Sequence, residues 1–482
     1  MLIIGLILTF LTGFSLLCFL SKQKLSIAES IGLSFPMGLF QMVLLISLSD
    51  ILGIGVHPGI SIGGGILLSL LWIVFAKRKK HGLPFFAFSH DWKSIFSSFN
   101  LVWLIFFIAL VGMEWMNFSK CLYFPTFDRD SVVGFDTIGY LIAQEHTIRN
   151  LSVFQVEVNP GIHNPGSYVS YAPLVQEAYA MVYQWGAETS KSIPALMYLS
   201  LLFAFYGFMK RSIGATGSII ATFFMMITPE MVSFSSMSGT NVIHAIYAAL
   251  GCMYGLAYLV PALAGGNSSK TYLYLSAILL AANIYTRYEG VVFPAAVGIF
   301  MLVQTIRKKI LLKNFAYWCL IIIMPFLIWK IYQRASGMYT ENFMIPIFSF
   351  DEEKASTILS AFWGLLTNQI YYGWTFILAF IAFIANLWFV IKKRDSIIPF
   401  ATVFLSIVFY ALVLYYVDYV WDSIHNVLAY SAKRFFFCFS ILAWFYLSSV
   451  YPLRQGLLFL DRKLSLFPSA KKGNTKAKTD KA

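Results

Sequence analysis

The chain has 482 residues, of which 59% are hydrophobic and 12% are charged, and its formal net charge is +13. A soluble domain carries about 25% charged residues, so this chain cannot cover itself with polar surface and must lie mainly in lipid. The basic residues lie in short clusters between apolar segments, which indicates the positive-inside pattern of a membrane protein and not a nucleic-acid partner.

About thirteen segments are long and apolar enough to cross a bilayer as helices, and they are too long and too uniformly apolar for barrel strands. The sequence therefore predicts an all-α polytopic membrane protein. In chain order the segments cover residues 2–20, 31–54, 58–76, 99–117, 192–209, 214–232, 240–263, 272–286, 290–306, 314–332, 370–391, 397–417 and 435–453.

The basic clusters predict how the chain is oriented. With thirteen spans and the N-terminus outside, six clusters fall on one side, which the positive-inside rule makes cytoplasmic together with the C-terminus. The clusters are Lys22 with Lys24, Lys77–Lys80, Lys210–Arg211, Arg307–Lys309, Lys392–Arg394 and the lysines of the tail.

The same pattern predicts four parts of the chain. These are an N-terminal three-helix extension (1–80), a cytoplasmic linker (81–98), a transmembrane core (99–455) and a basic cytoplasmic tail (456–482). The core carries a large extracytoplasmic loop over residues 118–190. In that loop YAPLVQEAYAMVYQWGAE has helical apolar spacing, so we expect an amphipathic helix that lies in the membrane interface.

Three aspartates, Asp128, Asp130 and Asp136, lie in one stretch of nine residues after the fourth span. Asp136 and Tyr140 are four residues apart, so they share one face of a helix that starts near Asp136. One interpretation is structural: Asp136 caps the helix, and the other aspartates lie in a solvated loop. A cluster of carboxylates at a membrane surface also suits a general base, or a site for Mg²⁺ or Mn²⁺ at Asp128 and Asp130.

Other charged groups lie on the same predicted side. Lys433 and Arg434 open the last span against the positive-inside preference, which points to function. Arg287 and Glu289 either pair with each other at a helix end or bind substrate. Glu145, His163 and His425 are further polar candidates in the outer loops, whereas Glu230 reads as a helix-boundary residue and Asp351–Glu353 as a solvated face.

Four motifs occur in order over residues 99–455: FDTIGY with LIAQE, HNPG with YAPL, TRYEG, and AKRFFF. Together they resemble the glycosyltransferase-C superfamily, and in particular the group of protein mannosyltransferases and aminoarabinose transferases. Asp136 and Tyr140 match the D-x-x-x-Y pattern of the first outer loop in that superfamily, although Thr137 stands where many members have Glu.

The resemblance implies a membrane glycosyltransferase of cell-envelope glycan biosynthesis that takes a sugar from a polyprenyl-phosphate donor. Transfer to a lipid, glycan or protein acceptor on the extracytoplasmic face would be an inverting displacement with an aspartate as general base. Asp136 and Asp130, with Asp128 beside them, are the candidates for the base and for holding a metal ion or the acceptor. Cations bind phosphate oxygens well, so the candidates for the donor phosphate are Arg287, Lys433 and Arg434. The remaining candidates for substrate binding are Tyr140, Glu145, His163, Glu289 and His425.

Two other classes of protein are open alternatives. An O-antigen polymerase or ligase has a similar size, but we expect its large outer loop nearer the C-terminus. A flippase or transporter of lipid-linked glycans would place polar groups deep within the spans, whereas ionisable residues here gather near helix ends. The expected place is a bacterial inner membrane, with membrane lipids and the lipid-linked donor as partners, no nucleic acid, and no cofactor apart from the divalent cation.

Overall fold

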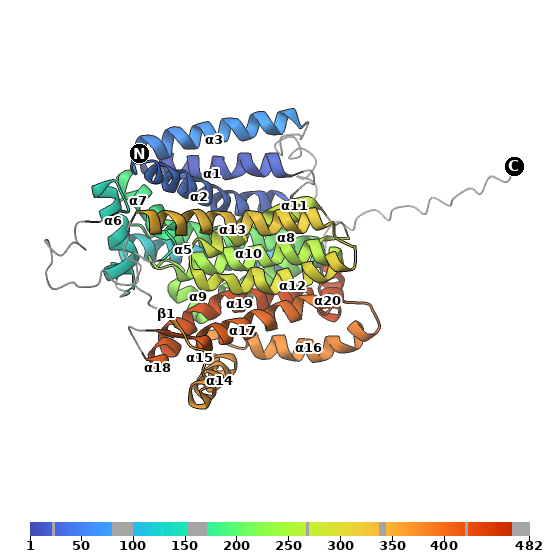
Figure 1. Ribbon diagram of the computed structural model, residues 1–482. Coiled ribbons are helices and arrows are strands. Elements are labelled where there is room, and N and C mark those ends of the chain that lie inside the picture. The colour runs from blue at the N-terminus through green and yellow to red at the C-terminus, as the bar shows by residue number, and fades with distance from the viewer. Residues whose placement is uncertain are drawn as a thin grey trace.

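A computed structural model describes residues 1–21, 25–79, 100–126, 128, 130–149, 151, 171–266, 269–336, 344–419 and 423–464. The long helices lie side by side, and the short elements gather mainly at one end of them (Figure 1). Within the described residues, ten helices are long and apolar enough to cross a membrane. The prediction of an all-α polytopic membrane protein is therefore confirmed, while the number of crossings and their orientation stay predictions.

All but the last of the long helices follow the predicted spans closely; the last matches no span and falls mainly in the predicted tail. The long helices are α1 (Leu2–Leu20), α2 (Ile27–Ile51), α3 (Pro58–Arg78), α5 (Leu101–Tyr123), α8 (Ser192–Met226), α10 (Asn241–Leu259), α11 (Lys270–Ile284), α12 (Val292–Ile306), α13 (Leu312–Ala335), α16 (Thr375–Ile391), α17 (Ile398–Tyr416), α19 (Lys433–Ser449) and α20 (Tyr451–Leu464). Among these, α11 and α16 are apolar but shorter than the ten, and α20 is amphipathic.

The helix α8 covers two predicted spans. Gly214 interrupts it with φ of 77° and ψ of 174°, a backbone conformation that glycine adopts without strain. The Ser218 hydroxyl then donates to the Tyr206 carbonyl at 2.6 Å, so the chain folds back on itself at Gly214. Asp461 of α20 accepts a hydrogen bond from the Thr216 N–H at 2.8 Å and thereby caps the second half of α8.

Shorter elements connect the long helices. They are η2 (Asp130–Phe135), α6 (Asp136–Glu145), α7 (Leu174–Gln184), α9 (Pro229–Phe234), η5 (Pro261–Ala264), η6 (Tyr288–Val291), β1 (Met344–Pro346), α14 (Glu352–Thr367), α15 (Gln369–Tyr372), β2 (Val417–Tyr419), α18 (Ile424–Val427) and η7 (Leu428–Ala432). The two strands pair antiparallel, with Ile345 opposite Asp418. Helix α14 lies within the segment 333–369 that the sequence predicted as a loop, and the Asp351 side chain caps it by accepting from the Lys354 N–H at 2.9 Å.

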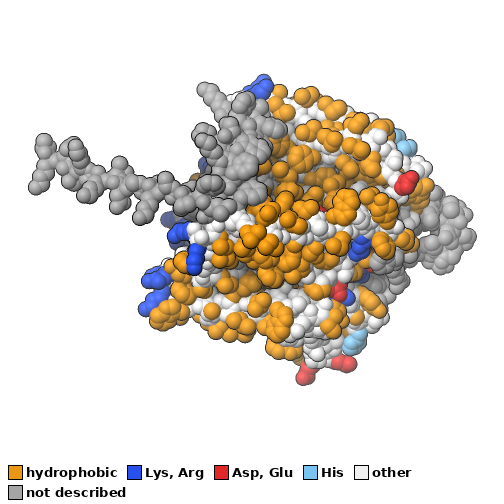
Figure 2. Space-filling model, turned by 180° about the vertical axis from the view of Figure 1, so that it is seen from behind, with side chains coloured by type: hydrophobic (Ala, Val, Ile, Leu, Met, Phe, Trp, Pro, Cys, Tyr) orange, Lys and Arg blue, Asp and Glu red, His pale blue; other side chains and the backbone are white. Residues whose placement is uncertain are grey.

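The core of the bundle contains α10, whose residues Asn241–Ala257 are all buried. Helices α2, α8 and α19 also bury most of their residues, whereas α3 and α5 expose most of theirs to the surroundings. Hydrophobic side chains cover the flanks, while most basic groups lie toward one end and acidic and histidine groups toward the other (Figure 2). This separation of charge agrees with the orientation that the basic clusters predict.

The prediction of an interfacial helix in the outer loop is wrong for α7. Residues Leu174–Val182 are all buried, including Gln176 and Glu177. The Ser47 hydroxyl of α2 donates to Glu177 Oε2 at 2.5 Å, so one oxygen of a carboxyl group that suggested exposure has its partner inside the protein. Helix α7 therefore packs as a core helix against α2 and α6.

The N-terminal helices are joined to the rest of the bundle by buried polar contacts. Asp50 at the end of α2 is fully buried and accepts from the Thr147 hydroxyl at 2.9 Å and from the Tyr332 hydroxyl at 2.7 Å. At the other end of α2, Glu29 forms an ion pair with Arg211 of α8. The division of the chain at residue 80 stays a prediction, but α2 is packed among helices on both sides of it.

We expect Asp50→Ala to lower the free energy of unfolding by about 1–3 kcal/mol, because the buried Tyr332 hydroxyl and the half-buried Thr147 hydroxyl would lose their acceptor. The measurement is a thermal melt in detergent followed by a thiol-reactive dye. Four buried free cysteines report unfolding: Cys18, Cys121, Cys252 and Cys438. As a control, Glu352→Ala removes an exposed carboxylate and should change stability by less than about 0.5 kcal/mol. Equal melting temperatures for the two variants would contradict the role given to Asp50.

Candidate active site

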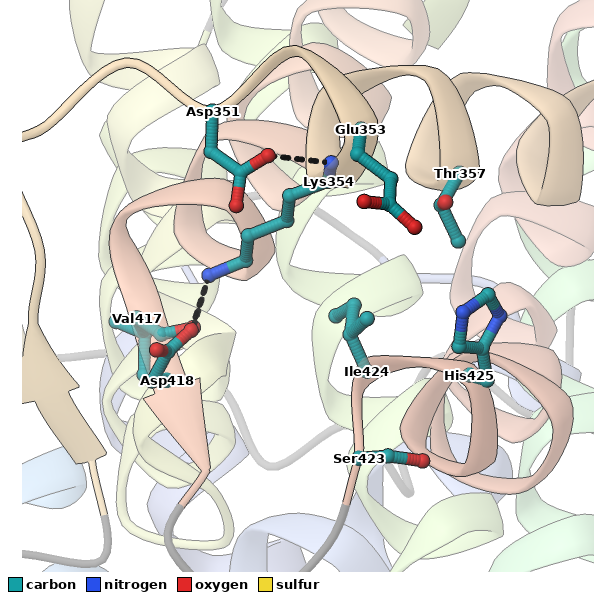
Figure 3. Close-up of a pocket in the computed structure, with 9 residues that line it drawn as sticks. All are labelled: Asp351, Glu353, Lys354, Thr357, Val417, Asp418, Ser423, Ile424 and His425. Atoms are coloured by element: carbon teal, nitrogen blue, oxygen red, sulfur yellow. Dashed lines mark hydrogen bonds and ion pairs between the residues drawn. The ribbon is translucent and has the colours of Figure 1, made fainter.

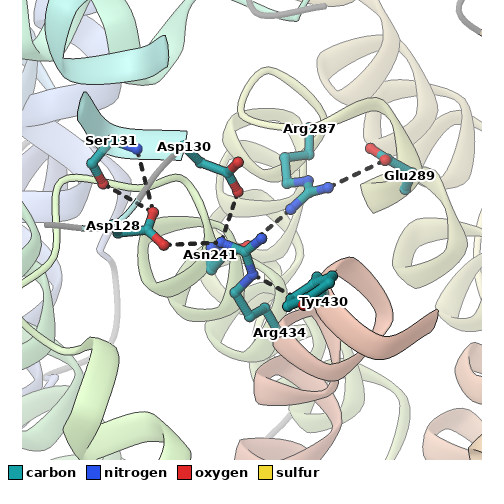
Figure 4. Close-up of polar contacts among 8 residues, drawn as sticks. All are labelled: Asp128, Asp130, Ser131, Asn241, Arg287, Glu289, Tyr430 and Arg434. Atoms are coloured by element: carbon teal, nitrogen blue, oxygen red, sulfur yellow. Dashed lines mark hydrogen bonds and ion pairs between the residues drawn. The ribbon is translucent and has the colours of Figure 1, made fainter. Parts of the chain in front are cut away.

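Arg434 binds two of the three predicted aspartates. Its Nη1 lies 2.7 Å from Asp130 Oδ2 and 3.5 Å from Asp128 Oδ1 (Figure 4). The side chains are mostly shielded, with exposed fractions of 11% for Arg434, 16% for Asp128 and 30% for Asp130. The first outer loop and the start of α19 therefore meet in one charged cluster, which we call the Arg434 cluster.

Local structure holds each member of the Arg434 cluster. The Ser131 N–H and hydroxyl both donate to Asp128 Oδ2, at 3.3 Å and 3.2 Å, where the short π-helix η2 begins. On the other side, Arg434 Nε donates to the Tyr430 carbonyl at 3.1 Å, in the π-helical turn η7 that leads into α19. Such turns are frequent at functional sites, and here one lies on each side of the ion pairs.

A second buried arginine lies at the start of α12. Arg287 Nη1 donates to Asn241 Oδ1 at 2.9 Å, and its Nη2 lies 3.3 Å from Glu289 Oε1. The pairing of Arg287 with Glu289 is therefore real, but Arg287 also reaches the first residue of α10. Because Arg287 and Glu289 are 7% and 5% exposed, both are charges that the fold keeps away from water.

Several polar atoms around Arg287 have no partner among the described residues. They are Arg287 Nε, Glu289 Oε2, His244 Nε2 and Asn283 Oδ1. Gly290 lies against two of them, since a Cβ there would be 2.4 Å from Asn283 Oδ1 and 2.9 Å from His244 Nε2. Buried polar groups are normally paired, so this concentration of unsatisfied atoms is typical of a site that receives a polar ligand or water.

Tyr171 connects the two arginines. Its ring lies with its centroid 5.7 Å from the Arg287 guanidinium carbon and packs edge-on against Phe135 of η2. Burial raises the pKa of Tyr171 to about 12, and the charges of Arg287, Glu289, Asp130 and Arg434 all act on it. The Arg434 cluster and the Arg287 pair are therefore parts of one electrostatic environment.

Burial also raises the pKa of Asp128, and the nearby Asp130 charge acts in the same direction. Arg434 and the hydrogen bonds from Ser131 oppose this rise without cancelling it. Asp128 therefore holds its proton at a higher pH than a solvated aspartate, for which the pKa is about 3.9.

Lys433 faces a different partner from its neighbour Arg434. Its Nζ lies 2.8 Å from Glu230 Oε1 of α9 and 4.6 Å from the centroid of the Tyr371 ring. The reading of Glu230 as a mere boundary residue is therefore wrong, because it supplies the counter-charge of a candidate site residue.

The third predicted aspartate, Asp136, contacts a tyrosine instead of an arginine. Asp136, at the start of α6, accepts a hydrogen bond from the Tyr183 hydroxyl of α7 at 2.6 Å. Tyr140 is 49% exposed and packs its ring against the Tyr183 ring at 5.5 Å. Glu145 is half-buried at the end of the same helix. The structure thus groups Asp136 and Tyr140 around Tyr183, and Asp128 and Asp130 around Arg434.

Of the two predicted histidines, the structure describes His425, which is not part of the Arg434 cluster. His425 lies in α18 and lines a polar cavity beside α14. His163 lies outside the described residues. No group of three or more His, Cys, Asp or Glu side chains in the described parts of the chain is placed to hold a metal ion. Asp128 and Asp130 offer oxygen atoms that suit Mg²⁺, but in this arrangement Arg434 balances their charge.

Sequence reasoning missed Tyr171, Tyr183 and Asn241. Tyr171 was visible as the first residue of the YAPL motif, and Tyr183 occurs in the segment misread as an interfacial helix. Asn241 carries no signal in the sequence, because an asparagine at the start of an apolar helix is an ordinary cap.

Comparison with known proteins gives one match. Residues 174–329 match the family model of dolichyl-phosphate-mannose-protein mannosyltransferase. That family is part of the glycosyltransferase-C superfamily, so the resemblance predicted from the motifs is confirmed. Comparison with curated proteins and with solved structures gives no match.

The family match supports a membrane glycosyltransferase of the glycosyltransferase-C type. It covers α7 to most of α13 and includes Asn241, Arg287 and Glu289. The Arg434 cluster lies outside the matched residues. The structure therefore joins the matched segment to two aspartates and an arginine that lie outside the match.

We expect Arg434→Gln to destabilise the glycosyltransferase by about 2 kcal/mol near neutral pH, because Asp128 and Asp130 would lose their counter-charge. The loss should shrink as the pH falls to about 4, since protonation removes the repulsion between the carboxylates and the pKa of Asp128 is already raised. Thermal melts across this pH range measure the effect. The matched control Arg462→Gln alters an exposed arginine of α20 and should show no such pH dependence. A pH-independent loss would count against the ion pairs.

Proposed function

We propose that the protein transfers a sugar from a polyprenyl-phosphate donor to a lipid, glycan or protein acceptor on the extracytoplasmic side of a bacterial inner membrane. The observation that carries the proposal is the Arg434 cluster beside Arg287 at the end of the bundle where the acidic loops gather. The matched family supports the reaction class, since its name describes sugar transfer from a dolichyl-phosphate sugar.

Arg434 is suited to bind the donor phosphate. Its Nη1 and Nε are engaged by Asp128, Asp130 and the Tyr430 carbonyl. The guanidinium group lies over the Phe234 ring, and within the described residues its Nη2 forms no hydrogen bond or ion pair. A guanidinium group offers five N–H donors in a fixed fork that matches phosphate oxygens. Arg434 can therefore bind a phosphate oxygen while the two aspartates hold its orientation.

Arg287 adds positive charge to the same environment. Its Nε is a buried donor with no partner in the described part of the chain, and both arginines act on Tyr171. Fixed positive charges in a water-poor site stabilise the negative charge that develops on a leaving phosphate. Arg287 thus supports departure of the polyprenyl phosphate from the sugar.

An aspartate completes the reaction by taking a proton. The acceptor oxygen forms a bond to the anomeric carbon as the bond from that carbon to the phosphate oxygen breaks. The electron pair of the broken bond leaves with the phosphate, and the proton of the acceptor hydroxyl passes to the aspartate carboxylate. Asp130 is the more exposed aspartate of the Arg434 cluster, at 30% against 16% for Asp128, and is our first choice for this base.

We expect Asp130→Asn to lower the transfer rate by about 10²–10⁴-fold, as loss of a general base does. Its loss of stability should be smaller than that of Arg434→Gln, because Asp128 still pairs with Arg434. The measurement is release of polyprenyl phosphate from a panel of radiolabelled polyprenyl-phosphate sugars. Asp136→Asn is assayed beside it, and Glu188→Gln, which alters an exposed acid in the loop between α7 and α8, is the matched control. If Asp136→Asn alone abolishes transfer, the base is Asp136 and the assignment to Asp130 is wrong.

The divalent cation at Asp128 and Asp130 is tested by a chelator. Because Arg434 already supplies a counter-charge to both carboxylates, we expect EDTA to change the transfer rate less than twofold. A loss of activity that added Mg²⁺ or Mn²⁺ restores would instead show that a metal ion joins or displaces Arg434 at the carboxylates.

A further inference from the structure

A polar groove runs along helix α14. A cavity of about 300 Å³ lies between the start of α14 and the segment around β2 and α18 (Figure 3). A second cavity of about 650 Å³ lies between the rest of α14 and η7. Both are lined by Thr357 and His425, so the two cavities adjoin each other along α14. We call them together the α14 groove, whose lining extends from Asp418 to Lys433.

Helix α14 has three chemically different faces. Lys354, Ile358, Phe362 and Leu365 are buried against the bundle. Leu359 and Trp363 are 66% and 70% exposed, as expected for side chains that face lipid. A third face presents Ser356, Thr357, Ser360 and Gly364 to the groove. An amphipathic helix needs only a buried and an exposed face, so the third face of small polar residues calls for a ligand.

The lining of the groove suits a sugar. Hydroxyl groups, the Asn368 amide and the His425 imidazole offer both donors and acceptors, as sugar hydroxyls require. Apolar side chains lie between them and can pack against the C–H faces of a sugar ring: Ala361, Leu365, Leu428 and Ala429. The two volumes lie within the range of about 300–1,000 Å³ that small-molecule sites occupy.

One end of the groove lies beside the Arg434 cluster. Lys433 lines it, and the next residue, Arg434, holds Asp128 and Asp130. At this end Glu230 and the Tyr371 ring fix the Lys433 ammonium group. A sugar bound along α14 would therefore extend toward the carboxylates that we propose to activate it.

The lipid-facing side of α14 indicates how such a sugar arrives. Leu359 and Trp363 lie on the face next to the hydroxyl-bearing face, and exposed tryptophan is typical of the membrane interface. The head group of a glycolipid can enter the groove while its chains stay in the bilayer beside α14. A soluble acceptor would gain nothing from this arrangement.

We propose that the α14 groove binds the saccharide head group of a glycolipid acceptor. This inference rests on the proposed transfer reaction and narrows its acceptor from a lipid, glycan or protein to a membrane glycolipid.

The test is protection of an engineered cysteine, which does not require transfer. Ser360→Cys places a thiol in the groove, and the native background is low because four of the five free cysteines are buried and Cys319 is half-buried. The protein in nanodiscs is labelled with a membrane-impermeant maleimide in the presence of alkyl disaccharides of hexoses and N-acetylhexosamines. Glu352→Cys, exposed on the first turn of α14 and outside the groove lining, is the matched control.

We expect at least one alkyl disaccharide to slow labelling of Ser360→Cys about tenfold at about ten times a dissociation constant of about 1 mM, with Glu352→Cys unchanged. Weaker protection by the free disaccharide would show that the alkyl chain contributes, and equal protection that the sugar alone is recognised. Protection only by a Ser/Thr-rich peptide, or by none of the sugars, would overturn the proposal. Sugar protection without donor consumption would leave the groove assigned and refute the transfer reaction.

Discussion

The ion pairs of Arg434 are the contacts on which the arrangement of the site depends. They join residues 306 positions apart in the chain, from the first outer loop to the start of α19. Without them, Asp128 and Asp130 would be two shielded like charges that had lost the cation they share, which is an unfavourable arrangement in a medium of low dielectric constant. The same contacts bring the loop next to Arg287 and Tyr171, and so turn separate helix ends into one site.

A similar rule governs the N-terminal helices. A carboxylate that is buried in apolar surroundings needs hydrogen-bond or ion-pair partners. Helix α2 carries two buried carboxylates, Glu29 and Asp50. Glu29 is bound by Arg211 and by the Tyr254 hydroxyl, and Asp50 by groups from the outer loop and α13. These contacts join α2 to α8 and α10 within the matched segment, and to the outer loop and α13. The three N-terminal helices therefore support the outer loop directly, since the Val56 N–H also donates to the His146 carbonyl at 2.6 Å.

The sequence predicted the long helices well because lipid imposes a simple length and composition on each of them. The prediction of an interfacial helix at α7 and of a loop at α14 was wrong, because amphipathic spacing in a sequence does not show what covers the polar face of a helix. In α7 that partner is Ser47, and in α14 the polar face borders a groove. The pairing of Arg434 with Asp130 was not readable either, although both residues were candidates, because it depends on how distant helices pack. Asn241 gave no signal at all.

The turn at Gly214 has a consequence for how the protein is made. The second half of α8 has its first N–H groups capped by Asp461, which lies 245 residues later than Thr216 in the chain. A ribosome delivers these helices in order, so the hairpin formed by the two halves of α8 lacks this partner until almost the whole polypeptide has been synthesised. Completion of an early hairpin is thereby tied to the arrival of the last helix.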